Sequence, residues 1–208
     1  MPNLFLTSSF ADVAARFPEF AGNPAGRSVA FIPTASMVEV YRGYVDDGRH
    51  ALRSLGMTVE ECDIAAAPLE HIARALQQSD YIYVSGGNTF YLLQEMRRKN
   101  VDCMLADHIS QGKTYIGESA GTLVLSPDIA CYAPMENPAA APELKGTKGL
   151  ALIPFYPLVH YRSEPFVEVC EKILAAHQGR LDIRPIANHE LFAVRGGVIE
   201  TWTVAKAV

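Results

Sequence analysis

Several features are missing from this sequence of 208 residues, and each absence excludes a class of protein. No apolar run approaches the ~20 residues that a membrane-spanning helix needs. The N-terminus has no basic stretch followed by a long apolar segment, which argues against a secretory signal. Lys and Arg number 18 against 23 Asp and Glu, so the net charge is -5 and the basic footprint of a nucleic-acid-binding protein is absent. We therefore expect a cytoplasmic protein without a membrane or nucleic-acid partner.

Cysteine is also scarce. The four residues, Cys62, Cys103, Cys131 and Cys170, form no Cys-x-x-Cys pair, and the six histidines do not join them at the spacing of zinc ligands. In a cytosolic protein such thiols stay reduced and mostly pack as small apolar side chains. We expect neither disulfides nor a zinc site.

The chain alternates between apolar runs typical of strands and segments with helical periodicity. The expected strands are residues 3–7, 28–33, 57–64, 80–84, 113–116, 182–186, 191–194 and 198–204. The expected helices are residues 37–55, 69–77, 89–99, 101–111 and 164–177. This alternation predicts an α/β fold, a mostly parallel, flavodoxin-like sheet with helices on both faces. Gly196-Gly197 predicts a C-terminal antiparallel hairpin at the sheet edge. No linker divides the chain, so we expect one domain over residues 1–208.

The most informative segment is Gly117-Glu118-Ser119-Ala120-Gly121, which matches the pattern G-x-S-x-G. An apolar strand precedes it and a helical segment follows it. In this strand–turn–helix setting a serine is held in a strained turn with its hydroxyl exposed, a nucleophile elbow. The N–H groups at the start of the helix face developing negative charge. The pattern predicts Ser119 as a nucleophile; the alternative is a packing turn around a small buried serine.

A second glycine turn, Ser85-Gly86-Gly87-Asn88, follows the expected central strand 80–84. Ligands bind at this end of parallel strands in open α/β sheets. The turn lacks the third glycine of a dinucleotide fingerprint and the Gly-Lys-Ser/Thr of a phosphate loop. Glycine permits close approach of a substrate to the backbone, and its N–H can stabilise an oxyanion.

A serine nucleophile needs a base, and six histidines compete for this role. His160 ends an apolar segment and leads into a polar turn, the strand-end position expected of a catalytic base. His189, also near a strand end, is its competitor. The other four lie on predicted helices, where solvent-exposed positions are expected: His50, His71, His108 and His177.

Taken together, these motifs resemble the peptidase E family, serine peptidases that include α-aspartyl dipeptidase and, more distantly, cyanophycinase. The matching pieces occur in family order with family-like spacing, between about residues 80 and 161. They are Ser85-Gly86-Gly87-Asn88-Thr89-Phe90 with Leu92-Leu93, Gly117-Glu118-Ser119-Ala120-Gly121, Ser126-Pro127-Asp128-Ile129, Gly149-Leu150 and His160-Tyr161.

The resemblance implies a fold like that of class I glutamine amidotransferases, with no metal and no cofactor. It implies Ser119 as the nucleophile and His160 as the general base. The backbone N–H groups of Gly87 and Ala120 would form the oxyanion hole. A small peptide is the implied substrate, and we expect a monomer or a homodimer.

We expect further substrate contacts from Gly86, Asn88 and Arg162. In aspartyl dipeptidases an arginine in an insertion beyond the catalytic histidine pairs with the substrate aspartate. This chain is short there, so that arginine has no positional equivalent. Arg162 offers a planar guanidinium suited to a carboxylate. The alternative is a surface residue paired with Glu164 or water.

The third member of the triad is open at this point. The family places an acidic residue just before a C-terminal strand, where this chain has Asn188 and, two residues on, Glu190. An asparagine can orient a histidine but supplies no anion. We weigh Glu190 and Asn188 about equally, and Glu136, in the Pro- and Ala-rich excursion 133–148, well below them.

These residues predict a serine peptidase that cleaves short peptides through an acyl-enzyme. One alternative is a small-molecule esterase or amidase with the same Ser–His pair. Another is a non-catalytic binding protein on an amidotransferase-like scaffold.

Overall fold

The computed structural model describes residues 2–205 of the chain. Its elements, with η marking 3-10 helices, run in the following order. They are β1 (Asn3–Thr7), α1 (Phe10–Val13), η1 (Ala14–Arg16), α2 (Phe17–Ala21), β2 (Ser28–Ile32), η2 (Thr34–Val38), α3 (Gly43–Ser54), β3 (Thr58–Glu61), α4 (Leu69–Gln78), β4 (Tyr81–Val84), α5 (Thr89–Arg98), α6 (Val101–Ser110), β5 (Thr114–Glu118), α7 (Ala120–Leu123), η3 (Ala130–Tyr132), η4 (Pro138–Ala140), β6 (Tyr156–Leu158), α8 (Val167–His177), β7 (Ile183–Pro185), β8 (Glu190–Arg195) and β9 (Val198–Thr203).

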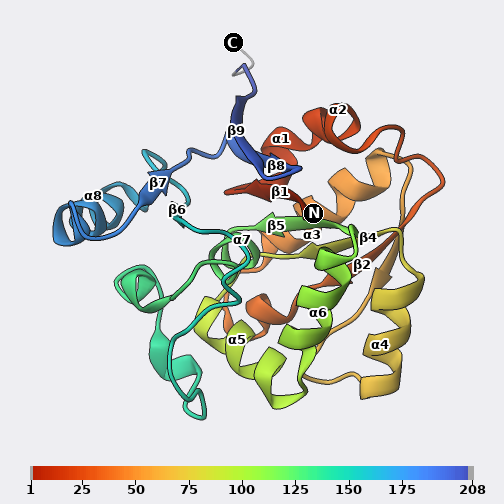
Figure 1. Cartoon of the computed structure of the whole chain (residues 1–208), viewed down its shortest axis with the longest axis horizontal. Coiled ribbons are helices and arrows are strands. Elements are labelled where there is room, and N and C mark those ends of the chain that lie inside the picture. Colours follow the sequence, from red (N-terminus) through yellow and green to blue (C-terminus); the bar gives the residue numbers. More distant parts are fainter. Residues whose placement is uncertain (1, 206–208) are drawn as a thin grey trace.

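A seven-stranded sheet with the order β3-β2-β4-β5-β1-β8-β9 organises the chain (Figure 1). The strands from β3 to β1 are parallel, and β8 and β9 continue the sheet in antiparallel pairing. Phe5 lies at the change of direction, opposite Ile116 of β5 on one side and Ala193 of β8 on the other. The predicted mostly parallel sheet with a C-terminal antiparallel hairpin is confirmed.

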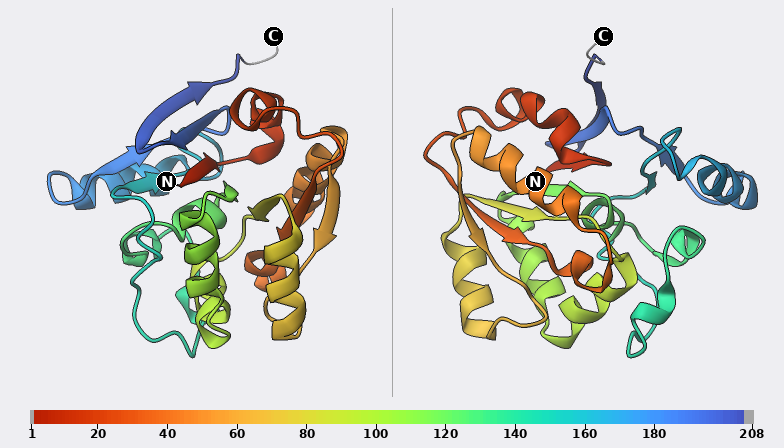
Figure 2. Two further views of the ribbon diagram at one scale, coloured as in Figure 1. Left: turned by 45° about the vertical axis from the view of Figure 1, so that its right-hand side comes forward. Right: turned by 180° about the vertical axis from the view of Figure 1, so that it is seen from behind.

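Side chains alternate between the two faces of the sheet, as the pleat requires. On β1, Leu4 and Leu6 join the apolar layer formed with α4, α5, α6 and α7. Phe5 points the other way, into a layer built with α1, α2 and α3. Figure 2 shows the sheet between these two groups of helices. Strands buried on both faces explain the near-continuous apolar runs in the sequence.

Two segments differ from the expected elements. The expected helix 37–55 is interrupted, because Glu39 is extended and Val40 and Tyr41 are exposed. The apolar residues that suggested one helical face therefore do not share a face. The helices α1 and α2 were not expected; they are short, and burial of their aromatic residues fixes them more than periodicity does.

A small parallel pair, β6 and β7, lies outside the main sheet and packs under α8 through Leu158, Cys170 and Ile173. In Figures 1 and 2 this unit lies at the end of the molecule opposite α4. It brings the chain after β6 back toward the carboxyl ends of β1 and β5. Over residues 2–205 we find no helix that is long and apolar enough to cross a membrane.

Candidate active site

Ser119 lies at the sharp turn between β5 and α7. Its backbone has φ 46° and ψ −109°, a strained conformation for a residue with a side chain. Its N–H donates to the carbonyl of Thr7, which ties the turn to β1 at 2.9 Å. Gly121 must be glycine here, because a Cβ would lie 2.2 Å from the carbonyl oxygen of Val84. The elbow is thus fixed by the two strands that flank β5.

The residue before the nucleophile, Glu118, is buried beneath the turn. Its carboxyl accepts hydrogen bonds from the Tyr83 hydroxyl at 2.6 Å and the Phe10 N–H at 2.9 Å. Burial raises the pKa of Glu118, although these hydrogen bonds counteract the shift. Glu118 therefore holds the elbow in place from the core side.

The structure brings three predicted residues into one hydrogen-bonded chain. The Ser119 hydroxyl lies 3.0 Å from Nε2 of His160, and Nδ1 of His160 lies 2.8 Å from Oδ1 of Asn188. An amide oxygen only accepts, so Nδ1 carries the proton and Nε2 is free to accept the serine proton. This is the geometry of a nucleophile, a base and an orienting group.

His160 is positioned by contacts that sequence reasoning missed. It has φ 58°, and its N–H donates to the Ser8 hydroxyl, which in turn donates to the carbonyl of Ile186, two residues before Asn188. The Phe166 ring stacks on the imidazole with centroids 4.7 Å apart. Ser8 follows β1 directly, and its position at the end of a strand is the sequence feature that could have identified it. Nothing in the sequence marks Phe166.

Burial is the main influence on His160, and it lowers the pKa of the imidazole. The hydrogen bond to Asn188 and the charge of Asp12 act in the opposite direction. The ring is consequently neutral at neutral pH, as a general base must be.

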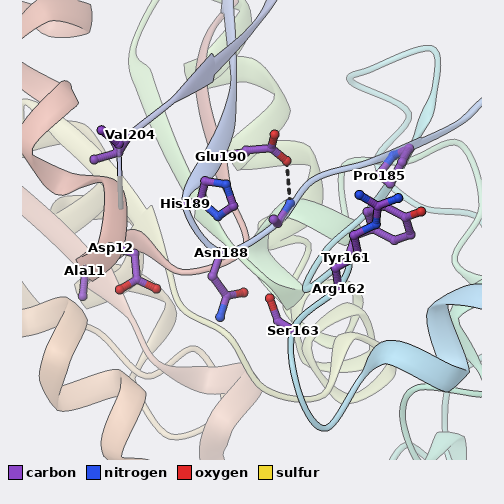
Figure 3. A pocket seen from close by; sticks show the side chains of 12 residues that line it. Ala11, Asp12, Tyr161, Arg162, Ser163, Pro185, Asn188, His189, Glu190 and Val204 are labelled. Carbon is purple, nitrogen blue, oxygen red and sulfur yellow. Dashed lines mark hydrogen bonds between the residues drawn. The ribbon is translucent and has the colours of Figure 1, made fainter. Parts of the chain in front are cut away.

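Glu190, weighed equally with Asn188 as the partner of His160, is engaged elsewhere. Its carboxylate accepts a hydrogen bond from the N–H of Ala187 at 2.8 Å, drawn as the dashed line in Figure 3. As the first residue of β8, Glu190 closes the tight turn that presents Asn188. The structure therefore places Asn188, and not Glu190, against the imidazole.

Glu136 is likewise not a partner of His160. Its carboxyl accepts from the Thr89 N–H and the Thr89 hydroxyl, both at 2.6 Å, and so caps the start of α5. Burial raises the pKa of Glu136 to about 7. The excursion 133–148 is thereby fastened to the glycine turn after β4.

That glycine turn approaches the chain after β2 closely. Gly87 has φ 135°, and a Cβ there would lie 2.2 Å from the carbonyl carbon of Ala35. The side chain of Asn88 accepts from the Tyr91 N–H and donates to the carbonyl of Asn137. Both polar ends of Asn88 therefore serve the protein's own backbone, at the N-cap of α5.

A pocket of about 1100 Å³ opens beside Asn188 (Figure 3). Its lining includes Asp12, Arg162 and His189, so it offers charges of both signs. The guanidinium of Arg162 stacks over the Tyr161 ring at 5.1 Å. His189 thus belongs to the pocket wall, whereas His160 contacts Ser119. Within residues 2–205, no three His, Cys, Asp or Glu side chains gather as metal ligands would.

Sequence comparison finds one family model, peptidase family S51, over residues 4–202. The uncharacterized peptidase Lmo0363 of Listeria monocytogenes is 47% identical over 97% of this chain and 98% of its own length. The uncharacterized peptidase PM1590 of Pasteurella multocida is 44% identical over 93% of this chain and 94% of its own. Peptidase E of Salmonella arizonae is 40% identical over half of this chain and 43% of its own length.

Comparison with solved structures also finds similar peptidases. A Listeria monocytogenes protein assigned provisionally to Peptidase E superimposes with a TM-score of 0.95 at 46% identity, covering 99% of this chain and all of that one. A peptidase from an acI-B1 actinobacterium gives a TM-score of 0.71 at 19% identity, over 99% of this chain and 88% of that one. At that identity the second match shows the shared fold alone.

Proposed function

Because the chain belongs to peptidase family S51 and is a serine-type peptidase, we propose that it hydrolyses short peptides, dipeptides among them, with Ser119, His160 and Asn188. The observation that carries the proposal is the continuous hydrogen-bonded chain from the serine hydroxyl through the imidazole to the amide. A packing serine has no need of a neutral, half-buried imidazole at 3.0 Å.

The reaction proceeds in two steps. The Ser119 hydroxyl attacks the scissile carbonyl carbon while Nε2 of His160 takes its proton. The tetrahedral intermediate collapses, the C–N bond breaks, and His160 gives the proton to the departing amine. Water, deprotonated by the same imidazole, then attacks the ester and releases the acid.

Two backbone N–H groups are suited to stabilise the oxyanion. Ala120 is the first residue of α7, so its N–H has no acceptor within the helix. Among the described residues, no backbone carbonyl accepts from the N–H of Gly87. Each donor of this kind is worth roughly 3 kcal/mol of transition-state stabilisation in related chemistry.

The pocket beside Asn188 is the proposed site for part of the peptide. Arg162 would bind a carboxylate of the substrate. We further propose that the chain acts as one domain in the cytoplasm, as a monomer or homodimer, without a nucleic-acid partner.

Labelling with a fluorophosphonate probe, followed by mass spectrometry, tests the nucleophile. We expect an adduct on Ser119 that is absent from Ser119→Ala and strongly reduced in His160→Ala. Hydrolysis of an active dipeptide by Ser119→Ala should fall by about four orders of magnitude or more. Folded wild-type protein that takes no label, or a Ser119→Ala variant that keeps its turnover, contradicts the proposal.

A substrate panel separates peptides from the alternative substrates. Dipeptides and p-nitrophenyl esters are offered to the same preparation at equal concentration. Turnover of dipeptides supports the proposal. Turnover of esters alone, with Ser119 labelled, assigns the enzyme to small-ester hydrolysis instead.

A further inference from the structure

One buried hydroxyl near the nucleophile has no hydrogen-bond partner. Among the described residues, three buried side-chain polar atoms lack one: the Tyr44 hydroxyl, the Ser79 hydroxyl and one Asp102 oxygen. Buried hydroxyls are nearly always satisfied, so each exception needs an explanation. Ser79 is the C-cap of α4 and Asp102 lies in the first turn of α6, whereas Tyr44 lies beside the glycine turn of the active site.

Gly86 separates Tyr44 from the nucleophile. A Cβ built on Gly86 would lie 3.2 Å from the Cβ of Ser119, and 3.3 and 3.5 Å from Cε2 and Cδ2 of Tyr44. Since glycine has no side chain, the edge of the Tyr44 ring faces Ser119 across this position. Only Gly86 therefore lies between the Tyr44 ring and the nucleophile.

The topology places Tyr44 and His160 on opposite sides of Ser119. Tyr44 belongs to α3, which follows β2, and Gly86 follows β4. His160 instead contacts Ser8, which follows β1, on the other side of β5 in the sheet. His160 must face the departing amine to protonate it, so the Tyr44 side receives the acyl part of the peptide.

The surroundings keep the Tyr44 hydroxyl protonated. Burial raises the pKa of the phenol well above its ordinary value, and the charges of Glu39, Glu118 and Glu136 act in the same direction. Arg42 is the opposing charge. A neutral phenol remains a hydrogen-bond donor throughout the pH range in which His160 acts as a base.

We propose that Tyr44 is a substrate-binding residue whose hydroxyl donates a hydrogen bond to an oxygen of the acyl part of the peptide. This inference rests on the proposed peptidase function. Because the hydroxyl is closed to water in the free chain, the Tyr44 side chain turns as the peptide binds, and the peptide then provides the hydrogen-bond partner that the folded chain does not. The class of substrate is a short peptide whose N-terminal residue presents an oxygen acceptor beside the attacked carbonyl.

The test compares Tyr44→Phe with the wild type and with Tyr41→Phe. Tyr41 is a matched control, because it is 72% exposed and its ring lies 6.1 Å from that of Tyr44. For Tyr44→Phe we expect kcat/KM for dipeptides to fall by about 10- to 100-fold. Its melting temperature should be unchanged or higher, since no protein hydrogen bond is lost. Ser119 labelling by a small alkyl fluorophosphonate should keep the wild-type rate, which shows that the Ser119–His160 pair is intact.

The outcomes separate this inference from the proposed function. Equal kcat/KM for Tyr44→Phe and the wild type overturns the inference. A variant in which peptide hydrolysis, fluorophosphonate labelling and melting temperature all fall together also overturns it, because that result marks a structural role. A wild-type protein that neither takes label nor cleaves peptides overturns the proposed function, and this inference with it.

Discussion

Asn188 gives this site an orienting group without a charge. Its amide oxygen accepts the Nδ1 proton of His160 and so selects the tautomer that can deprotonate Ser119. A carboxylate in the same place would also stabilise the imidazolium that forms in the transition state. Because burial lowers the pKa of His160, the proposed base stays neutral to a lower pH than a solvent-exposed histidine would.

Replacement Asn188→Asp should therefore change the pH dependence. A neighbouring anion raises the pKa of His160, so less of the base form exists at a given pH. We expect the acid limb of the kcat/KM profile to move to higher pH, measured on any active dipeptide. Glu190→Gln is the control and should leave the limb in place, because its amide oxygen can keep the bond to Ala187. A limb that stays fixed or moves to lower pH in Asn188→Asp contradicts the role given to this residue.

Among the elements, α5 connects the excursion 133–148 to the active site. Its N-cap, Asn88, belongs to the glycine turn, and Glu136 from the excursion binds the next residue, Thr89. A carboxyl held in this way with a pKa of about 7 is protonated in the folded protein at pH values where the unfolded chain is ionised. The cap therefore contributes more to stability below pH 4.5 than above pH 7.

For Glu136→Gln we expect a stability that no longer depends on this ionisation. Relative to the variant, the wild type should lose stability as pH rises from about 5 to 8, by on the order of 3 kcal/mol at most. Thermal unfolding of both proteins at the two pH values measures the difference. If the gap in melting temperature is the same at pH 5 and pH 8, Glu136 does not titrate in this window.

At the scale of the elements, only part of the active site could be predicted from the sequence. The elbow and the glycine turn follow strands in a local pattern, so their place at one sheet edge could be predicted. The partner of His160 could not, because Asn188 and Glu190 are two residues apart in a turn whose direction depends on packing. Ser8 and Phe166 contact His160 through chain folding alone. The expected helix 37–55 failed because its apolar residues lie partly on the surface.

At the scale of the whole molecule, two apolar layers hold the sheet. One of them is rich in aromatic residues: Phe5 contacts the rings of Phe10, Phe17 and Phe20 at centroid distances of 5.3 to 6.2 Å. Phe5 is fully buried at the junction of the parallel and antiparallel strands. Its side chain thus stabilises both parts of the sheet at once.

Phe5→Ala should cost about 3–5 kcal/mol of unfolding free energy, because it leaves a cavity in this layer. Val198→Ala, at a position that is 61% exposed, is the control and should change stability by less than about 0.5 kcal/mol. Urea unfolding measures both. A loss below about 1 kcal/mol for Phe5→Ala would show that the layer closes around the gap.

The pairing of β1 with β8 has a consequence for biosynthesis. Ser119 is made 41 residues before His160, and Asn188 follows 28 residues later, just ahead of the strand that must pair with the first one. The residues of the elbow are therefore synthesised before the residue that orients the proposed base. In the proposed mechanism, cleavage therefore requires the C-terminal strands to pair with the N-terminal one, so the completed chain would be the first active form.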